Sequence, residues 1–329
     1  MDTTSGERSD AAVWGALGVV YVLWGSTYLG MAVVVETLPA FLGMGTRFAV
    51  SAVIMAVLIL IVRGPAALRV TGRQLVSAAV IGIMLLVFGN GVVAASERYV
   101  PSGIAALVVA ITPVVVVVLR RATGDRPARA TVLGVALGLA GVAALVVVSA
   151  RRTESPGYGY QDLPEAQTLL WTLAILAAAL SWAVGSFISS RYSRQGRLPT
   201  DPLTMTFWQF VAGAAGLLLA GVLTGESMPP PSQWGARATT AWLFLVVAGI
   251  LAFLAYTWLL ANARLSLVAT YAYVNPVVAI VLGWWIKDES LTLALVVCAA
   301  VILAGVALVV QGEQNKPPEP ADPQAEGET

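Results

Sequence analysis

Ten apolar runs, each long enough to cross a lipid bilayer, constrain this chain more than any other feature of its sequence. An α-helix rises 1.5 Å per residue, so about 20 residues span a hydrocarbon core roughly 30 Å thick. The expected spans are 13–35, 38–62, 75–96, 102–119, 130–149, 168–190, 203–223, 240–260, 266–286 and 291–310. This pattern predicts an all-α, polytopic membrane protein of ten transmembrane helices.

Composition agrees with a surface that faces lipid, and it restricts the chemistry. Of the 329 residues, 58% are hydrophobic and 11% are charged, whereas a soluble domain carries about 25% charged residues. The chain has no histidine, and its one cysteine, Cys298, lies in an apolar run. We therefore expect no disulfide, no metal and no cofactor. The net charge of +1 predicts no nucleic-acid partner.

The distribution of Lys and Arg predicts the orientation. These residues are enriched in cytoplasmic loops. If the N-terminus is cytoplasmic, 13 of the 19 basic residues fall in inside segments and five in outside loops, with Arg47 within a span. Both termini are therefore expected in the cytoplasm. The segments expected along the chain are a cytoplasmic N-terminal segment at 1–12, a five-helix repeat at 13–149, an external connecting loop at 150–167, a second repeat at 168–310 and a disordered, Pro-rich tail at 311–329.

The two halves of the chain resemble each other. PVVVVVL at 113–119 aligns with PVVAIVL at 276–282, and LAGVA occurs at both 139–143 and 303–307. Each repeat holds five spans, an odd number, so the second copy must lie upside down in the membrane. Two inverted repeats are the architecture of many secondary transporters.

Four sequence stretches also resemble a known family. They are WGSTYLG at 24–30, GTRFAVSA at 45–52, GNGVVAASERYVPSGIAALVVAITP at 89–113 and VATYAYVNPVVAIVLG at 268–283. They are similar to the EamA-type drug/metabolite transporter superfamily, and within it to the YedA-like exporters. The resemblance covers residues from about 12 to 311. It implies two inverted EamA units in the inner membrane that export metabolites or drugs, but no particular substrate. Thr112 stands where the second half has Asn275, so the halves should contribute unequally to a binding site.

Arg47 is the only charged residue well inside an expected span. An unpaired arginine at that depth costs at least about 2.5–3.5 kcal/mol on insertion scales, so it should face a partner or a wet cavity. It could bind an anionic or carboxylate-bearing substrate, or lock a gate. It could equally be a structural tie, for example to Glu97, or extend to the outer face.

Pro113 and Pro276 fall near the middle of spans four and nine. A proline removes one helical hydrogen bond and frees a carbonyl group, and such groups are tolerated in a membrane where they line a cavity. We expect the two prolines to act as hinges beside the substrate site. Asn275, with Tyr271 one turn before it, would bind substrate there; the alternative role for Asn275 is a hydrogen bond between helices.

Aromatic and amide side chains in the spans complete the expected substrate site, because promiscuous small-molecule cavities combine apolar walls with a few polar groups. Asn90 and Gln209 could instead bridge helices. The predicted substrate-binding residues are Trp24, Tyr28, Arg47, Asn90, Thr112, Trp182, Gln209, Tyr271 and Asn275.

The leading functional interpretation is a secondary transporter that exports small organic molecules by alternating access. A channel or facilitator is the first alternative. A membrane-embedded lipid-linked transferase is disfavoured, because the spans hold no clustered acids and no nucleophile with a base, so we expect no enzymatic activity. The expected partners are a small-molecule substrate and the lipid bilayer. Gly134 and Gly138 have the spacing of close helix contacts, within the chain or in a homodimer.

Overall fold

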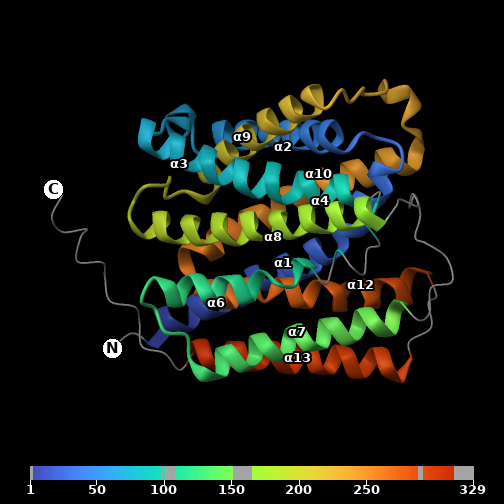
Figure 1. Cartoon of the computed structure of the whole chain (residues 1–329). Coiled ribbons are helices and arrows are strands. Elements are labelled where there is room, and N and C mark those ends of the chain that lie inside the picture. Colours follow the sequence, from blue (N-terminus) through green and yellow to red (C-terminus); the bar gives the residue numbers. More distant parts are fainter. Residues whose placement is uncertain are drawn as a thin grey trace.

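The computed structural model describes residues 3–97, 99–100, 105, 108–150, 165–287 and 292–314. These residues form helices and connecting loops, without strands (Figure 1). Each of the ten expected spans coincides with helical residues. The first half comprises α1 (Thr3–Val35), α2 (Ala40–Val62), α3 (Gly72–Gly82), η2 (Ile83–Gly91), α4 (Val92–Ser96), α6 (Thr112–Ala122) and α7 (Arg129–Ala150). The second half comprises α8 (Glu165–Arg194), α9 (Pro202–Leu223), α10 (Gly235–Asn262), α11 (Leu265–Ala269), α12 (Tyr271–Lys287) and α13 (Leu293–Gln314). Short 3-10 turns η1 (Pro65–Leu68) and η3 (Pro231–Gln233) lie in the loops.

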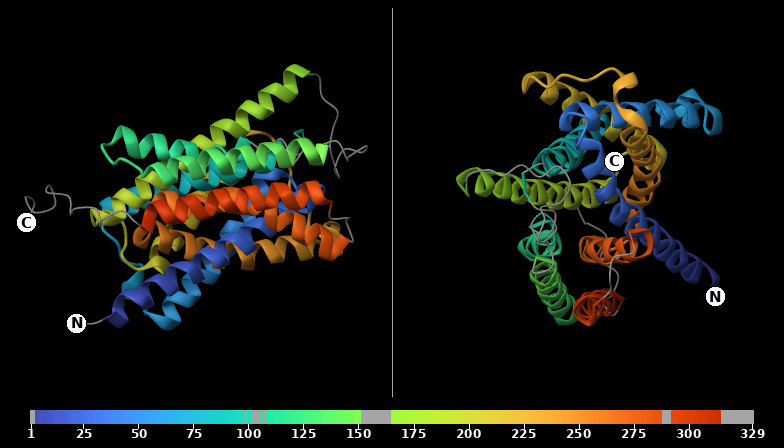
Figure 2. Two further views of the ribbon diagram at one scale, coloured as in Figure 1. Left: turned by 90° about the horizontal axis from the view of Figure 1, so that it is seen from below. Right: turned by 90° about the vertical axis from the view of Figure 1, so that its right-hand side faces the viewer.

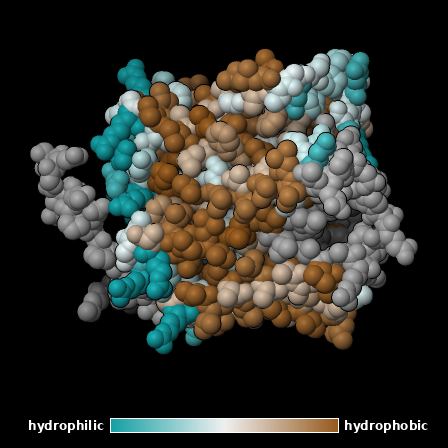
Figure 3. Space-filling model, viewed as in Figure 1, coloured by the Kyte–Doolittle hydropathy of each residue, from teal (hydrophilic) through white to brown (hydrophobic). Residues whose placement is uncertain are grey.

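Seven of the described helical stretches are long and apolar enough to cross a membrane. The helices run roughly parallel to one another, and a broad apolar belt covers the middle of the face shown in Figure 3, with hydrophilic residues toward its ends. Large apolar side chains such as Ile61, Leu219 and Leu223 are exposed on the outside of the bundle. Because lipid tails are as apolar as leucine, such exposure is favourable only in a bilayer. The chain is a multi-pass membrane protein.

Helix ends are set by local signals that the sequence contains. Thr71 and Gln74 form a reciprocal capping box at the start of α3. Asp201 caps α9 with a bond to the Thr204 amide of 3.2 Å, and Pro202 occupies the first turn, where no amide hydrogen is needed. The start of α2 is capped from a distance: the Glu226 carboxylate accepts hydrogen bonds from the amides of Phe41 and Leu42 at 3.1 and 2.8 Å.

The helices of one half make contacts similar to those of their counterparts in the other half. α1 packs against α10, and its counterpart α8 packs against η2 and α4. Likewise α1 packs against α12, and α8 against α6. Two further pairs join equivalent helices of the two halves: α2 with α9, and α7 with α13 (Figures 1 and 2).

Glycines bring α7 and α13 into close contact. A Cβ atom on Gly134 would lie 2.5 Å from the Gly305 carbonyl oxygen, and one on Gly305 would lie 2.6 Å from the Gly138 amide nitrogen. The close contact expected for Gly134 and Gly138 is therefore made within the chain, backbone against backbone.

The C-terminal boundary differs from the expectation. The tail was expected to begin at 311, but α13 continues to Gln314 and Glu313 is only 4% exposed. The reason is tertiary: the Glu313 carboxylate lies 2.8 Å from the Arg120 guanidinium, which compensates the buried charge. Residues 315–329, and most of the expected loop at 150–167, lie outside the described residues.

Spans four and nine are both interrupted, though not at their prolines. A turn at Ala110 and Ile111 precedes α6, and a turn at Thr270 separates α11 from α12. Pro113 therefore lies in the first turn of α6, where a proline costs no hydrogen bond, rather than in mid-helix as expected. Pro276 does lie inside α12, where it cannot donate to the Ala272 carbonyl.

Candidate functional site

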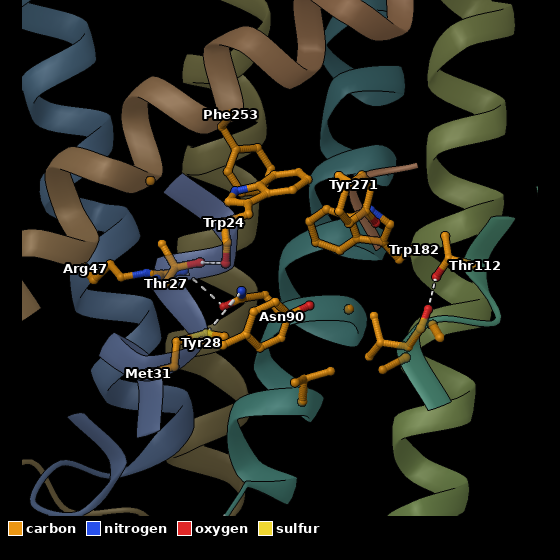
Figure 4. A pocket seen from close by; sticks show the side chains of 16 residues that line it. Trp24, Thr27, Tyr28, Met31, Arg47, Asn90, Thr112, Trp182, Phe253 and Tyr271 are labelled. Carbon is orange, nitrogen blue, oxygen red and sulfur yellow. Dashed lines mark hydrogen bonds between the residues drawn. The ribbon is translucent and has the colours of Figure 1, made fainter. Parts of the chain in front are cut away.

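A cavity of about 60 Å³ lies at the centre of the bundle, between the two halves (Figure 4). The first half contributes α1, α2, η2, α4 and the start of α6, and the second half contributes α8, α10 and α12. Its lining residues are Trp24, Thr27, Tyr28, Met31, Arg47, Gly89, Asn90, Val93, Val109, Thr112, Ala178, Ala179, Trp182, Gly249, Phe253 and Tyr271. A space of this size holds roughly four water molecules, so a larger organic ligand requires the walls to separate.

Seven of the nine predicted substrate-binding residues line this cavity: Trp24, Tyr28, Arg47, Asn90, Thr112, Trp182 and Tyr271. The other two, Gln209 and Asn275, are buried but are not among the lining residues. The Asn275 amide lies beside the Tyr28 hydroxyl without a hydrogen bond of good geometry, and the Gln209 amide has no hydrogen-bond partner.

Aromatic rings form the apolar wall of the cavity. Trp24 is at their centre, with its ring centroid 5.3 Å from that of Trp182, 5.5 Å from Phe253 and 4.9 Å from Tyr271, all edge to face. This arrangement is the favoured geometry for aromatic pairs. Trp182 is held in turn by a 3.0 Å hydrogen bond from its indole nitrogen to the Tyr256 hydroxyl. The cavity therefore has a rigid aromatic side.

Among the described residues that line the cavity, Arg47 alone carries a charge. Its side chain is 3% exposed, and one terminal nitrogen donates to the Asn90 carbonyl oxygen at 3.1 Å. Its Nε has no hydrogen-bond partner, and none of the ion pairs among the described residues involves it. The Glu97 side chain, at the end of α4, interacts electrostatically with the Arg47 guanidinium. In Figure 4 Arg47 and Thr112 lie at opposite sides of the aromatic rings.

The π-helix η2 positions Asn90. The wide turns of π-helices are rare and often lie at functional sites. Here glycines let η2 approach its neighbours: a Cβ atom on Gly89 would lie 2.6 Å from the Trp182 ring, and one on Gly82 would lie 2.5 Å from the Gln209 carbonyl oxygen. Asn90 is thereby brought between Arg47 and Met31, whose sulfur is 3.6 Å from the amide nitrogen.

The break in span nine is attached to α1. The Tyr21 and Thr270 hydroxyls are 2.5 Å apart, and the Thr270 hydroxyl also donates to the Leu267 carbonyl. One turn further along α1, Trp24 contacts Tyr271, the first residue of α12. These contacts of α1 therefore fix the break between α11 and α12 next to the cavity.

Sequence reasoning did not single out Phe253 and Tyr256 of α10. Both are buried, and they contact Trp24 and Trp182. Their spacing of three residues places them on one face of the helix. Span eight, however, contains no charge, proline or amide near them to mark that face as the inner one. Thr27 and Met31, also unpredicted, lie on the same face of α1 as Trp24 and Tyr28.

No His, Cys, Asp or Glu side chain is among the described residues that line the cavity. Among the described residues there is no group of three or more His, Cys, Asp or Glu side chains placed to hold a metal ion. Its chemistry is that of recognition, with one guanidinium, one amide, hydroxyl groups and aromatic faces.

Comparison with known proteins shows which family the chain belongs to. The EamA-like transporter family model matches residues 11–147 and 169–311, one copy for each half. The chain belongs to the EamA-like transporter family. It is 34% identical over 311 residues to the inner membrane transporter YedA of Escherichia coli (strain K12), covering 94% of each protein. It is 24% identical over 296 residues to the transporter YoaV of Bacillus subtilis (strain 168), covering 88% of this chain and 94% of YoaV.

A solved crystal structure shares the fold. It superposes with a TM-score of 0.72 at 22% identity, covering 93% of this chain and 98% of the other. The family match and the similarity to YedA support a multi-pass transporter of the inner membrane, and both relatives named above are called transporters.

Proposed function

We propose that this EamA-like protein is a secondary transporter that exports small organic molecules by alternating access, and that the central cavity is its substrate site. Family membership supports transport in general. The position of the cavity supports the mechanism, because its walls come from both halves. Movement of one half against the other would open the cavity to one side and then the other.

The observation that carries the proposal is Arg47 in its aromatic surroundings. A buried guanidinium whose hydrogen-bonding groups are only partly used is costly unless an anion arrives to complete them. Arg47 uses one nitrogen on Asn90, and its Nε has no hydrogen-bond partner among the described residues. We infer that the substrate carries a carboxylate or similar anionic group for Arg47 and an apolar or aromatic part for the Trp24 side of the cavity.

The repeat supports alternating access by the two halves. The second half carries Gln209 at the position of Arg47, so only one half supplies a charge. The helix contacts persist when the halves are exchanged. We propose that the two five-helix repeats have inverted topology, that both termini are cytoplasmic and that the symmetry supplies the two alternative facings.

Substitution of Arg47 tests this function in proteoliposomes. We expect Arg47→Gln, which copies the residue of the second half, to lower uptake of anionic substrates by tenfold or more, because a hydrogen bond to a charged group contributes about 1.5–3 kcal/mol. Arg191→Gln, which removes an exposed arginine at the end of α8, is the matched control and should transport normally. A panel of anionic, neutral and cationic metabolites identifies the class.

Two results would contradict the proposal. Normal transport by a folded Arg47→Gln protein would remove Arg47 from the site. Flux without acceleration by substrate on the opposite side of the membrane would favour a channel, because only a carrier exchanges one bound molecule for another.

A further inference from the structure

The cytoplasmic end expected for the bundle contains a buried ionic network that the substrate site does not use. Arg120, at the end of α6, is 7% exposed, and Glu313, in the last turn of α13, is 4% exposed. Their side chains pair at 2.8 Å. The same arginine nitrogen donates to the hydroxyl of Ser266 in α11. The network therefore joins the two halves.

Further contacts enclose the Glu313 carboxylate. The Thr131 hydroxyl, in the first turn of α7, donates to it at 3.0 Å, and Arg264 lies 3.8 Å from its second oxygen. Arg120 also pairs with Asp125 at 2.6 Å, but that contact stays within the turn between α6 and α7. Four helical elements, α6, α7, α11 and α13, thus meet at one pair of opposite charges.

The network and the cavity are joined by one face of α6. Thr112, Val116 and Arg120 are spaced four residues apart and so share one face of α6. Thr112 lines the cavity and Val116 is fully buried. Arg120 lies about 12 Å along the helix from Thr112. On the facing segment, Tyr271 lines the cavity and Ser266 contacts Arg120. α6 and α11 are in contact at this end.

The two halves differ at the positions of this ion pair. The alignment of PVVVVVL with PVVAIVL places Gly283 at the position of Arg120, and the two LAGVA stretches place Ser149 at the position of Glu313. Among the described residues, a charged pair is therefore found at only one of the two equivalent sets of positions. A transporter with this difference would have unequal energies for its two facings.

We propose that the Arg120–Glu313 network is a latch that closes the cytoplasmic side of the substrate cavity and biases the protein against the inward-facing state. This proposal rests on the alternating-access function proposed above. Such a latch is reversible, because opening toward the cytoplasm admits water, which solvates the separated charges in place of their pairing. A contact shifts the equilibrium between the two facings only if its free energy differs between them. The Arg120–Glu313 network would be such a contact, because it forms when the cytoplasmic side is closed and breaks when that side opens.

The test is the accessibility of Val116 from the cytoplasmic side. Val116→Cys, in a Cys298→Ala background, is labelled with a membrane-impermeant thiol reagent in inside-out vesicles without substrate. We expect slow labelling with the latch intact and labelling faster by roughly tenfold or more with Glu313→Gln. The matched control is Arg121→Gln, which removes the exposed neighbouring arginine of α6, and it should label slowly.

A second variant separates the latch from general destabilisation. Arg120→Gln with Glu313→Gln removes both members of the buried ion pair together, and it should also label quickly while it remains folded by size-exclusion chromatography. Slow labelling of this folded double variant would overturn the latch, as would equally fast labelling of Arg121→Gln. The assay needs no substrate, so loss of the transport function proposed above would be recognised separately, by absent uptake in the unmodified protein.

Discussion

Asn275 and Gln209 are buried amides whose side chains form no hydrogen bond of good geometry among the described residues. A buried polar group left unpaired costs about 1–3 kcal/mol. The protein retains both amides in the bundle, although neither lines the cavity as it stands. Asn275 lies against Tyr28, a cavity residue, so a small movement of α12 would turn its amide toward a ligand. We keep Asn275 as a predicted substrate contact of the open cavity.

Substitution of Asn275 should separate binding from stability. We expect Asn275→Ala to unfold at the same temperature as the unmodified protein or higher, because it removes an unpaired buried amide. We expect substrate affinity to fall roughly three- to tenfold, the value of one hydrogen bond. Thermal unfolding in detergent and equilibrium binding measure the two effects.

Asn262→Ala is the control for this experiment. The Asn262 side chain is exposed and donates to the Trp258 carbonyl oxygen at 2.8 Å, at the end of α10. It should leave affinity unchanged. Unchanged affinity in Asn275→Ala as well would assign Asn275 to helix packing.

At the scale of elements, the π-helix η2 and the two interrupted spans distinguish this bundle from ten straight helices. η2 places Asn90 beside Arg47, and the breaks at Ala110–Ile111 and Thr270 bring Thr112 and Tyr271 to the cavity. Helix interruptions in a membrane must be stabilised by neighbours or line a cavity. Both breaks do adjoin the cavity. The hinge role proposed for Pro113 and Pro276 stays a prediction, with the turns rather than the prolines as the points of interruption.

The contact between η2 and α8 depends on Gly89. We expect Gly89→Ala to destabilise the protein by about 1–3 kcal/mol, because a Cβ atom would lie 2.6 Å from the Trp182 ring and overpack the site. The displaced Trp182 should also weaken substrate binding. Thermal unfolding and transport rate measure the two effects.

Gly249→Ala is the matched control, since Gly249 lines the same cavity inside α10 but its Cβ would meet nothing within 4 Å. It should keep or raise stability, by up to about 1 kcal/mol from helix propensity. Equal stability of the two variants would show that η2 and α8 are not closely packed.

At the scale of the whole molecule, the chain ends and the basic loops give an orientation. The described ends of the chain lie at the same end of the bundle (Figures 1 and 2). The loops after α2, α6 and α8 carry arginines such as Arg63, Arg126 and Arg197. Because basic loops are retained in the cytoplasm, this end is expected inside.

Cysteine labelling tests this orientation. In a Cys298→Ala background, we expect Gln233→Cys, in the exposed turn η3, to react with an impermeant thiol reagent added to whole cells. Arg194→Cys, exposed at the end of α8, should react only after permeabilisation. The opposite pattern would invert the topology and place the Arg120–Glu313 network at the outer side.

The sequence by itself determined the helical membrane class, the approximate spans, the repeat and the family, because hydrophobic length and charge placement are local properties that a bilayer converts directly into structure. It also singled out seven of the sixteen residues that line the cavity, since a polar or aromatic side chain within an apolar span is conspicuous. Only the tertiary structure revealed Phe253 and Tyr256 as cavity neighbours, the π-helix and the burial of Glu313. Each of these depends on which helix faces which: Phe253 is one apolar residue among many until α10 packs on α1, and Glu313 reads as part of a polar tail until Arg120, 193 residues away in sequence, pairs with it.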